Sequence, residues 1–198
     1  MGCGAQIIGG AVAALVGLAG AARSEETLPE FSACIDAEVA RYEWRLRVHR
    51  DRALDAADFD LWDVRGVEYC GNIGVTRCDR SAAPLACQKA LAGDQHVLHG
   101  HIMAALPDPP PPGEGQGLPT RLYHTAWHLA RDISAGPDCA GAGEVMATWC
   151  TAREANLRLK SAVLAWQVGR YLGLAAPAVT TGWADPPPPP RPKARPGR

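Results

Sequence analysis

Apolar and half-apolar side chains between Thr27 and Ala57 recur at alternating intervals of four and three residues, along Phe31, Ile35, Val39, Tyr42, Leu46, His49 and Ala53. This spacing is the period of an α-helix, so we expect one amphipathic helix over 27–57. Thr27 and Glu30 have the spacing of a capping box, which predicts that the helix starts at Thr27. The opposite face carries charged side chains: Asp36, Glu43, Arg47, Arg50 and Asp51.

Three later segments, 81–106, 120–134 and 144–174, repeat the helical period, and Ser81 and Thr120 stand where a capping hydroxyl is favoured. The last segment is the longest, and its expected core stripe is Val145, Trp149, Ala152, Ala155, Leu159, Val163, Trp166 and Arg170. Residues 67–80 hold two cysteines and two glycines. We therefore expect a loop there, with 73–75 as a short extended piece.

Two proline-rich segments limit the helical pattern. Residues 107–119 read PDPPPPGEGQGLP, and consecutive prolines lack N–H donors, so this segment predicts a break between helices. The end of the chain, 177–198, includes PPPPPRPKARPGR, and its composition predicts a disordered basic tail. The expected fold is all-α: one helical domain over 27–176, a disulfide-stapled bundle of about four helices.

The N-terminal segment 1–22 has the composition of a secretory signal peptide. Residues 7–22 are apolar and rich in small side chains, and Ala19/Ala21 or Gly20/Ala22 supply suitable positions before a cleavage site. The apolar run is shorter than the ~20 residues that a membrane-spanning helix needs. We therefore expect a periplasmic or secreted protein.

Six cysteines remain after removal of this segment: Cys34, Cys70, Cys78, Cys87, Cys139 and Cys150. An even number of cysteines behind an export signal indicates three disulfides, although the sequence does not choose among the possible pairings. Zinc binding is the alternative. It is disfavoured because no C-x-x-C motif occurs and the nearest cysteines are separated by seven, eight and ten residues.

Charge is distributed unevenly along the chain. Residues 23–185 hold all 21 acidic side chains and 16 of the 20 basic ones, a net charge of −5, which argues against nucleic-acid binding by the folded part. Residues 186–198 have no acidic side chain and carry four positive charges, which predicts at most a weak contact with an anionic surface. These are Arg191, Lys193, Arg195 and Arg198.

Five histidines fall in two groups, His96, His99 and His101 in one helix and His124 and His128 in the next. Residues four apart share a helix face, so His124 and His128 are candidate metal ligands together with His96 or His99. The H-E-x-x-H protease motif is absent because Thr125, Ala126 and Trp127 separate the last two histidines. Histidine-based metal binding is therefore the alternative function.

Motifs for hydrolase, nucleotide and dinucleotide chemistry are missing: the sequence has no G-x-S-x-G, no P-loop and no G-x-G-x-x-G. We expect no cofactor and a non-enzymatic role. Four tryptophans are expected in the core: Trp62, Trp127, Trp149 and Trp166. Trp44 lies off the apolar stripe of its helix, so it either packs on a second neighbour or is exposed for a partner.

One family resemblance begins at Cys34-Ile-Asp36-Ala-Glu38 and continues to Tyr42-Glu43 and Arg45-Leu46. This segment resembles the helical motif of small exported proteins similar to the lysozyme-inhibitor LprI N-terminal family, and Trp149-Cys150-Thr151-x-Arg153-Glu154 resembles the family's closing helix. The resemblance implies an exported, disulfide-linked helical protein that binds another envelope protein or a lysozyme-type enzyme. A basic enzyme would then dock by charge complementarity on the acidic face of the first helix, formed by Asp36, Glu43 and Asp51 beside Trp44.

Overall fold

A computed structural model describes residues 28–49, 60–111, 113 and 116–189. These residues form six α-helices and one short 3₁₀-helix and no strand, which confirms the all-α prediction. The helices are α1 (Phe31–His49), α2 (Arg65–Asp79), α3 (Pro84–Ala104), α4 (Leu118–Asp132), α5 (Glu144–Leu172) and α6 (Ala178–Thr181), with the 3₁₀-helix η1 (Pro137–Cys139) before α5.

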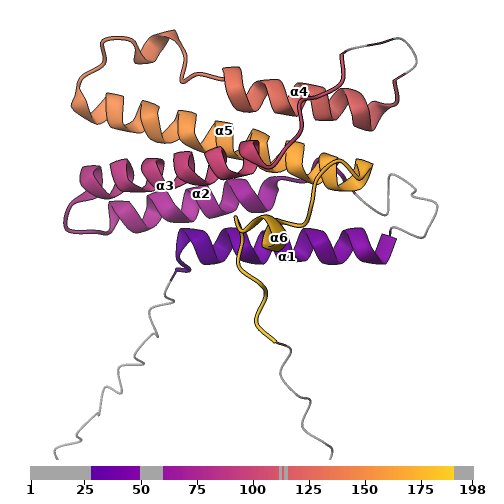
Figure 1. Cartoon of the computed structure of the whole chain (residues 1–198). Helices are drawn as coiled ribbons and strands as arrows, with labels where there is room; N and C mark the ends of the chain where they lie inside the picture. The colour runs from indigo at the N-terminus through magenta and orange to yellow at the C-terminus, as the bar shows by residue number, and fades with distance from the viewer. Residues whose placement is uncertain (1–27, 50–59, 112, 114–115, 190–198) are drawn as a thin grey trace, which may run out of the picture.

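The five long helices lie roughly side by side (Figure 1). The α5 helix packs against α2, α3 and α4, whereas α1 packs chiefly against α2. The layers therefore run from α4 through α5 and the α2–α3 pair to α1. The short α6 returns the end of the chain to α1 and the last turns of α5.

The second half of α5 is buried on all sides, because nearly every residue from Leu159 to Gly169 is covered by another element. At its centre the indole ring of Trp166 lies 5.5 Å from the ring of Tyr42 and 4.9 Å from that of Trp183. Trp166 Nε1 donates to the carbonyl of Ala176 at 3.1 Å, and Tyr42 Oη donates to the carbonyl of Gln167 at 2.6 Å. Trp166 thus ties α1, α5 and the C-terminal segment into one core.

The prediction of a loop over 67–80 is wrong, because residues 65–79 form the regular helix α2. The described part of the bundle therefore has five long helices. The two glycines that suggested a loop are places of close helix approach. A Cβ at Gly71 would lie 2.3 Å from Asn156 Oδ1 of α5, and a Cβ at Gly74 would lie 2.8 Å from a methyl carbon of Leu91 in α3. The glycines make room for neighbouring side chains at a cost of about 1 kcal/mol each in helix propensity.

The helix starts also differ from the sequence predictions. The first helix begins at Phe31, so Glu30 precedes it, and the prediction that Thr27 and Glu30 form a capping box inside the helix start is wrong. Thr27 itself and residues 50–57 lie outside the described part of the chain. Ser81 donates to the carbonyl of Cys78 and Thr120 is the third residue of α4, so neither hydroxyl caps its helix. Prolines lie in the first turns of α3 and α4 instead. Proline suits a helix start because it has no N–H group, and the N–H groups of the first turn have no partner within the helix.

The helical domain extends beyond the expected boundary at residue 176. Ala178 and Trp183 are buried in the main core, and the backbone amide of Asp185 donates to Asp36 Oδ1 at 3.0 Å. The predicted boundary at 177 therefore places the start of the tail too early in the sequence. The basic residues 191–198 lie outside the described residues.

Three disulfides confirm the predicted framework and fix its pairing. Cys34–Cys70 joins α1 to α2, Cys78–Cys87 joins α2 to α3, and Cys139–Cys150 joins η1 to α5. Disulfides of this number are consistent with an oxidising compartment outside the cytoplasm. In the portion of the chain that the structure describes, every helix is too short or too polar to cross a membrane.

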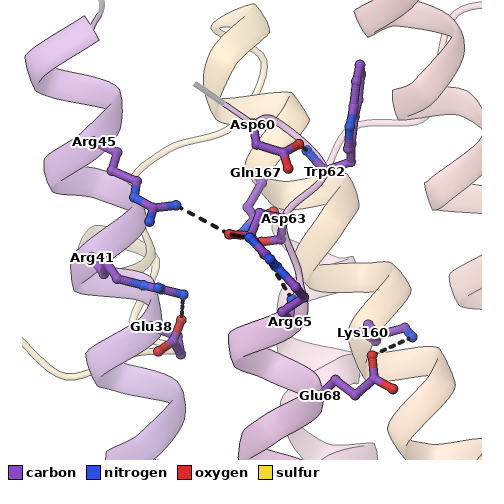
Figure 2. A network of polar contacts seen from close by, with 10 residues as sticks. All are labelled: Glu38, Arg41, Arg45, Asp60, Trp62, Asp63, Arg65, Glu68, Lys160 and Gln167. Atoms are coloured by element: carbon purple, nitrogen blue, oxygen red, sulfur yellow. Dashed lines mark hydrogen bonds and ion pairs between the residues drawn. The ribbon is translucent and has the colours of Figure 1, made fainter. Parts of the chain in front are cut away.

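A polar network holds the start of α2 against α1 and α5 (Figure 2). The carboxylate of Asp63 accepts from the backbone amide and guanidinium of Arg65, at 3.2 and 2.9 Å, and from the guanidinium of Arg45 at 3.4 Å. Gln167 of α5 donates to the main-chain oxygen of Asp63 at 3.4 Å. The hydrogen bond from Arg65, above all, lowers the pKa of Asp63 to about 2.

We expect Asp63→Asn to lower the free energy of unfolding at pH 7 by about 1–2 kcal/mol, because it removes the ionised acceptor of these bonds. The native pKa of Asp63 lies below its ordinary value of 3.8, so this stability is complete above about pH 4 and is lost as pH falls through 2. Urea unfolding of both proteins from pH 7 to pH 2 should show the difference shrinking with acid. The control is Asp60→Asn, because Asp60 is exposed and lies three residues before Asp63. This substitution should change the free energy of unfolding little. An equal loss of stability in Asp60→Asn would contradict the role assigned to Asp63.

Candidate binding groove

A groove of about 600 Å³ lies between α2, α3 and α5. Its volume is within the ~300–1,000 Å³ that is usual for small-molecule sites. Four of the residues that line it carry side-chain amides: Asn72, Gln88, Gln95 and Asn156. Apolar side chains make up much of the remaining wall: Val75, Leu91, Trp149, Ala152 and Leu157.

The amide side chains are placed by three different helices. Asn72 is on α2, Gln95 is on α3 and Asn156 is on α5, one residue after the buried Ala155. The absence of a side chain at Gly71 leaves the space that the Asn156 amide occupies. Packed helices fix these positions more firmly than loops would.

Two amide oxygens in the groove have no donor among the described residues. Gln95 is 1% exposed, and neither its Oε1 nor the buried Asn156 Oδ1 accepts a hydrogen bond from the protein. Buried polar atoms in folded proteins are almost always paired, so each such atom needs a specific explanation. Leaving one unpaired costs about 1–3 kcal/mol. Both residues line the same groove, but each of these two oxygens has less than 1 Å² of accessible surface, so neither is open to a ligand in this arrangement.

Trp149 forms an apolar part of the wall and is 48% exposed. The guanidinium carbon of Arg153 lies 5.2 Å from the centre of its ring. Trp62 is also exposed, whereas Trp127 and Trp166 are buried. The expectation that all four are core residues is therefore wrong for Trp62 and Trp149, and Val145 at the start of the same helical stripe is exposed as well.

The charges at the groove nearly cancel. Glu68 pairs with Lys160 of α5 at 3.3 Å, and Arg153 stacks on Trp149. Gln88 is occupied at the rim, because its Nε2 donates to Asp79 at 2.9 Å. The groove therefore presents neutral acceptors and an apolar wall.

The candidate metal ligands do not come together as one site. His99 Nε2 donates to the carbonyl of Ala130 at 2.9 Å, and burial lowers the pKa of His99. His124 and His128 are neighbours on α4, with ring centres 4.4 Å apart, but His96 is exposed on α3. Across the ranges 28–49, 60–111, 113 and 116–189, no three His, Cys, Asp or Glu side chains are placed to hold a metal ion.

The residues expected to bind a partner from α1 are only partly available. Trp44 is exposed, at 57%, but Glu43 is 16% exposed and its carboxylate accepts two bonds from Arg170, at 2.7 and 3.0 Å. Asp36 is half-buried and accepts from the amide of Asp185, and burial raises its pKa. The prediction that Glu43 belongs to an exposed acidic face is therefore wrong. Asp51 lies outside the described residues.

Neither Gln95 nor Asn156 stands out in the sequence. Side-chain amides belong to no catalytic or metal-binding motif, and both residues lie within ordinary helical patterns. One signal was present: Gln95 falls on the buried face of its helix between Leu91 and Ile102, where an amide is unusual. Comparisons with protein-family models, curated proteins and solved structures found no match to this chain.

We expect Gln95→Met to raise the free energy of unfolding by about 1 kcal/mol, because it replaces an unpaired buried amide with an apolar side chain of similar shape. Tyr123→Phe is the matched comparison. The hydroxyl of Tyr123 is buried and donates to Pro107 at 2.6 Å, so its loss should lower stability by about 1 kcal/mol. Chemical denaturation measures both. A loss of stability in Gln95→Met would contradict the unpaired state of its amide.

Proposed function

We propose that this chain is an exported, non-enzymatic binding protein whose ligand enters the groove between α2, α3 and α5. The observation that carries the proposal is the groove itself, of about 600 Å³, whose lining includes the exposed ring of Trp149 and side-chain amides from three helices.

Binding fits the lining better than catalysis does. General acid–base chemistry needs a titratable side chain free to exchange a proton with the substrate. The one carboxylate among the groove's lining residues, Glu68, is held by Lys160, and the one guanidinium, that of Arg153, stays protonated. The remaining polar lining residues are amides and Thr76, whose hydroxyl donates to the carbonyl of Asn72.

Export rests on two independent supports. The segment 1–22 has the composition of a signal peptide, and the three disulfides suit an oxidising compartment. Expression of the full chain in a Gram-negative host, followed by mass spectrometry of the periplasmic fraction without reduction, tests this. We expect a chain that starts at Ala22 or Arg23, with Cys34–Cys70, Cys78–Cys87 and Cys139–Cys150 linked. An uncleaved chain with reduced thiols in the cytosol would contradict export.

The family resemblance adds a lysozyme-type enzyme as a partner. It falls on α1, where Trp44 and Val48 are exposed and lie one turn apart. Exposed tryptophans are favoured anchors of protein interfaces, whereas Glu43 is already occupied by Arg170. The partner would therefore be held through Trp44 more than by the acidic side chains.

We expect the protein at micromolar concentration to slow cell-wall lysis by a lysozyme at low salt. Trp44→Ala should weaken the inhibition by at least about 2 kcal/mol, roughly thirtyfold in affinity. Trp62→Ala is the control, since Trp62 is similarly exposed but lies outside α1. Unslowed lysis, or an equal effect of both variants, would remove this partner.

A further inference from the structure

We propose that His124 and His128 of α4 chelate one divalent copper ion, with water in the remaining coordination positions. The two histidines are four residues apart, so they share one face of the helix. Neither of them lines the groove between α2, α3 and α5. The inference therefore goes beyond the proposed binding function and does not depend on it.

The separation of the two imidazole rings matches a chelate with a right angle at the metal. The ring centres lie 4.4 Å apart. A metal ion lies about 3.15 Å from the centre of an imidazole that binds it, given a metal–nitrogen bond of about 2.0 Å and a ring radius of about 1.15 Å. Two such rings at a right angle have centres about 4.5 Å apart, whereas the tetrahedral angle separates them by about 5.1 Å.

The right angle selects the metal. Tetragonal coordination by nitrogen and oxygen is typical of Cu²⁺ and Ni²⁺, whereas Zn²⁺ favours a tetrahedron. Cu²⁺ also binds nitrogen ligands more tightly than the other divalent ions of the first transition row. Among the described residues, no group of three His, Cys, Asp or Glu side chains is placed around one metal position, so water must supply the other ligands.

Both imidazoles are accessible from solvent, and one of them has a partner that orients it. The side chain of His128 is 47% exposed, and His124 is half-buried. His128 Nδ1 lies 3.7 Å from Asp132 Oδ2, within ion-pair distance. A histidine that binds a metal usually donates its other ring N–H to a carboxylate or a carbonyl, which fixes the ring. Asp132 in this role leaves His128 Nε2 for the metal.

The charges around the pair suit a cation. Asp132 supplies a negative charge one turn further along α4, at the C-terminal end of the helix, where the helix dipole is negative. Two arginines of α4 carry opposing charges, and both make other contacts. The guanidinium carbon of Arg131 lies 4.6 Å from the centre of the Trp127 ring, and Arg121 donates to the carbonyl of Gln116.

Calorimetric titration of the oxidised full-length chain with copper, nickel and zinc chlorides tests the proposal. Every protein carries Cys3→Ser, because Cys3 is outside the three disulfides and a free thiolate binds metals. We expect one Cu²⁺ ion per chain, and Ni²⁺ to bind at least as tightly as Zn²⁺. The electron paramagnetic resonance spectrum of the copper complex should show coupling to two nitrogens. His124→Ala and His128→Ala should each lower the association constant for Cu²⁺ at least tenfold.

Two controls separate chelation from the mere presence of histidines. The double variant His128→Ala, Leu129→His keeps two imidazoles on α4 but turns the second away from the first, and Leu129 is exposed. It should bind Cu²⁺ as weakly as His128→Ala does. The double variant His96→Ala, His101→Ala removes two exposed histidines of α3 and should leave the association constant unchanged. The thermal midpoints without metal should equal that of the parent protein, which shows that the fold is intact.

Each other outcome overturns a stated part of the proposal. Copper binding that survives both single variants, or that keeps its strength in the variant with the shifted histidine, would overturn the chelate. Zinc binding tighter than nickel binding would overturn the right-angled geometry and leave the histidine pair as a metal site. Absence of copper binding at micromolar protein would overturn the proposal as a whole.

Discussion

The burial of the second half of α5 is the constraint on which the rest of the bundle depends. A helix covered on all sides cannot fold stably alone, so its neighbours must supply its surroundings. Tyr42 from α1, Tyr123 from α4 and Trp183 from beyond α6 all close over the region around Trp166 and Gly169. The C-terminal segment 175–184 is therefore part of the core, although it directly precedes the proline-rich end of the chain.

Periodicity predicted most of the fold because the helical stripes are long and regular. The segments 81–106, 120–134 and 144–174 correspond to α3, α4 and α5, and the disulfide framework followed from the even cysteine count. The sequence could not reveal α2, because Gly71 and Gly74 are unfavourable in an isolated helix. Their value appears only when Asn156 and Leu91 occupy the space that they leave. Tertiary packing overrides local propensity at these two positions.

The candidate groove was harder to predict for a related reason. Trp149 fits a core stripe by spacing, but Val145, Met146 and Trp149 in the first turns of α5 are exposed. Gln95 has the opposite character, since it is polar and buried. Neither the exposure of Trp149 nor the burial of Gln95 can be read from residue type, because both depend on how the neighbouring helices pack.

The buried amide of Gln95 lowers the stability of the bundle. An apolar side chain at position 95 would complete the packing between α2, α3 and α5, whereas the amide leaves an acceptor unpaired. Natural proteins keep such costs where function requires them.

The pairing of the cysteines has a consequence for biogenesis. Each of the six pairs with the next one along the chain, so no disulfide loop encloses or crosses another. A chain that emerges from a translocation pore with its N-terminus first can close each bridge before the next pair appears. In an exported chain, as proposed above, oxidation in simple order of emergence would give the native pairing without rearrangement of mispaired thiols.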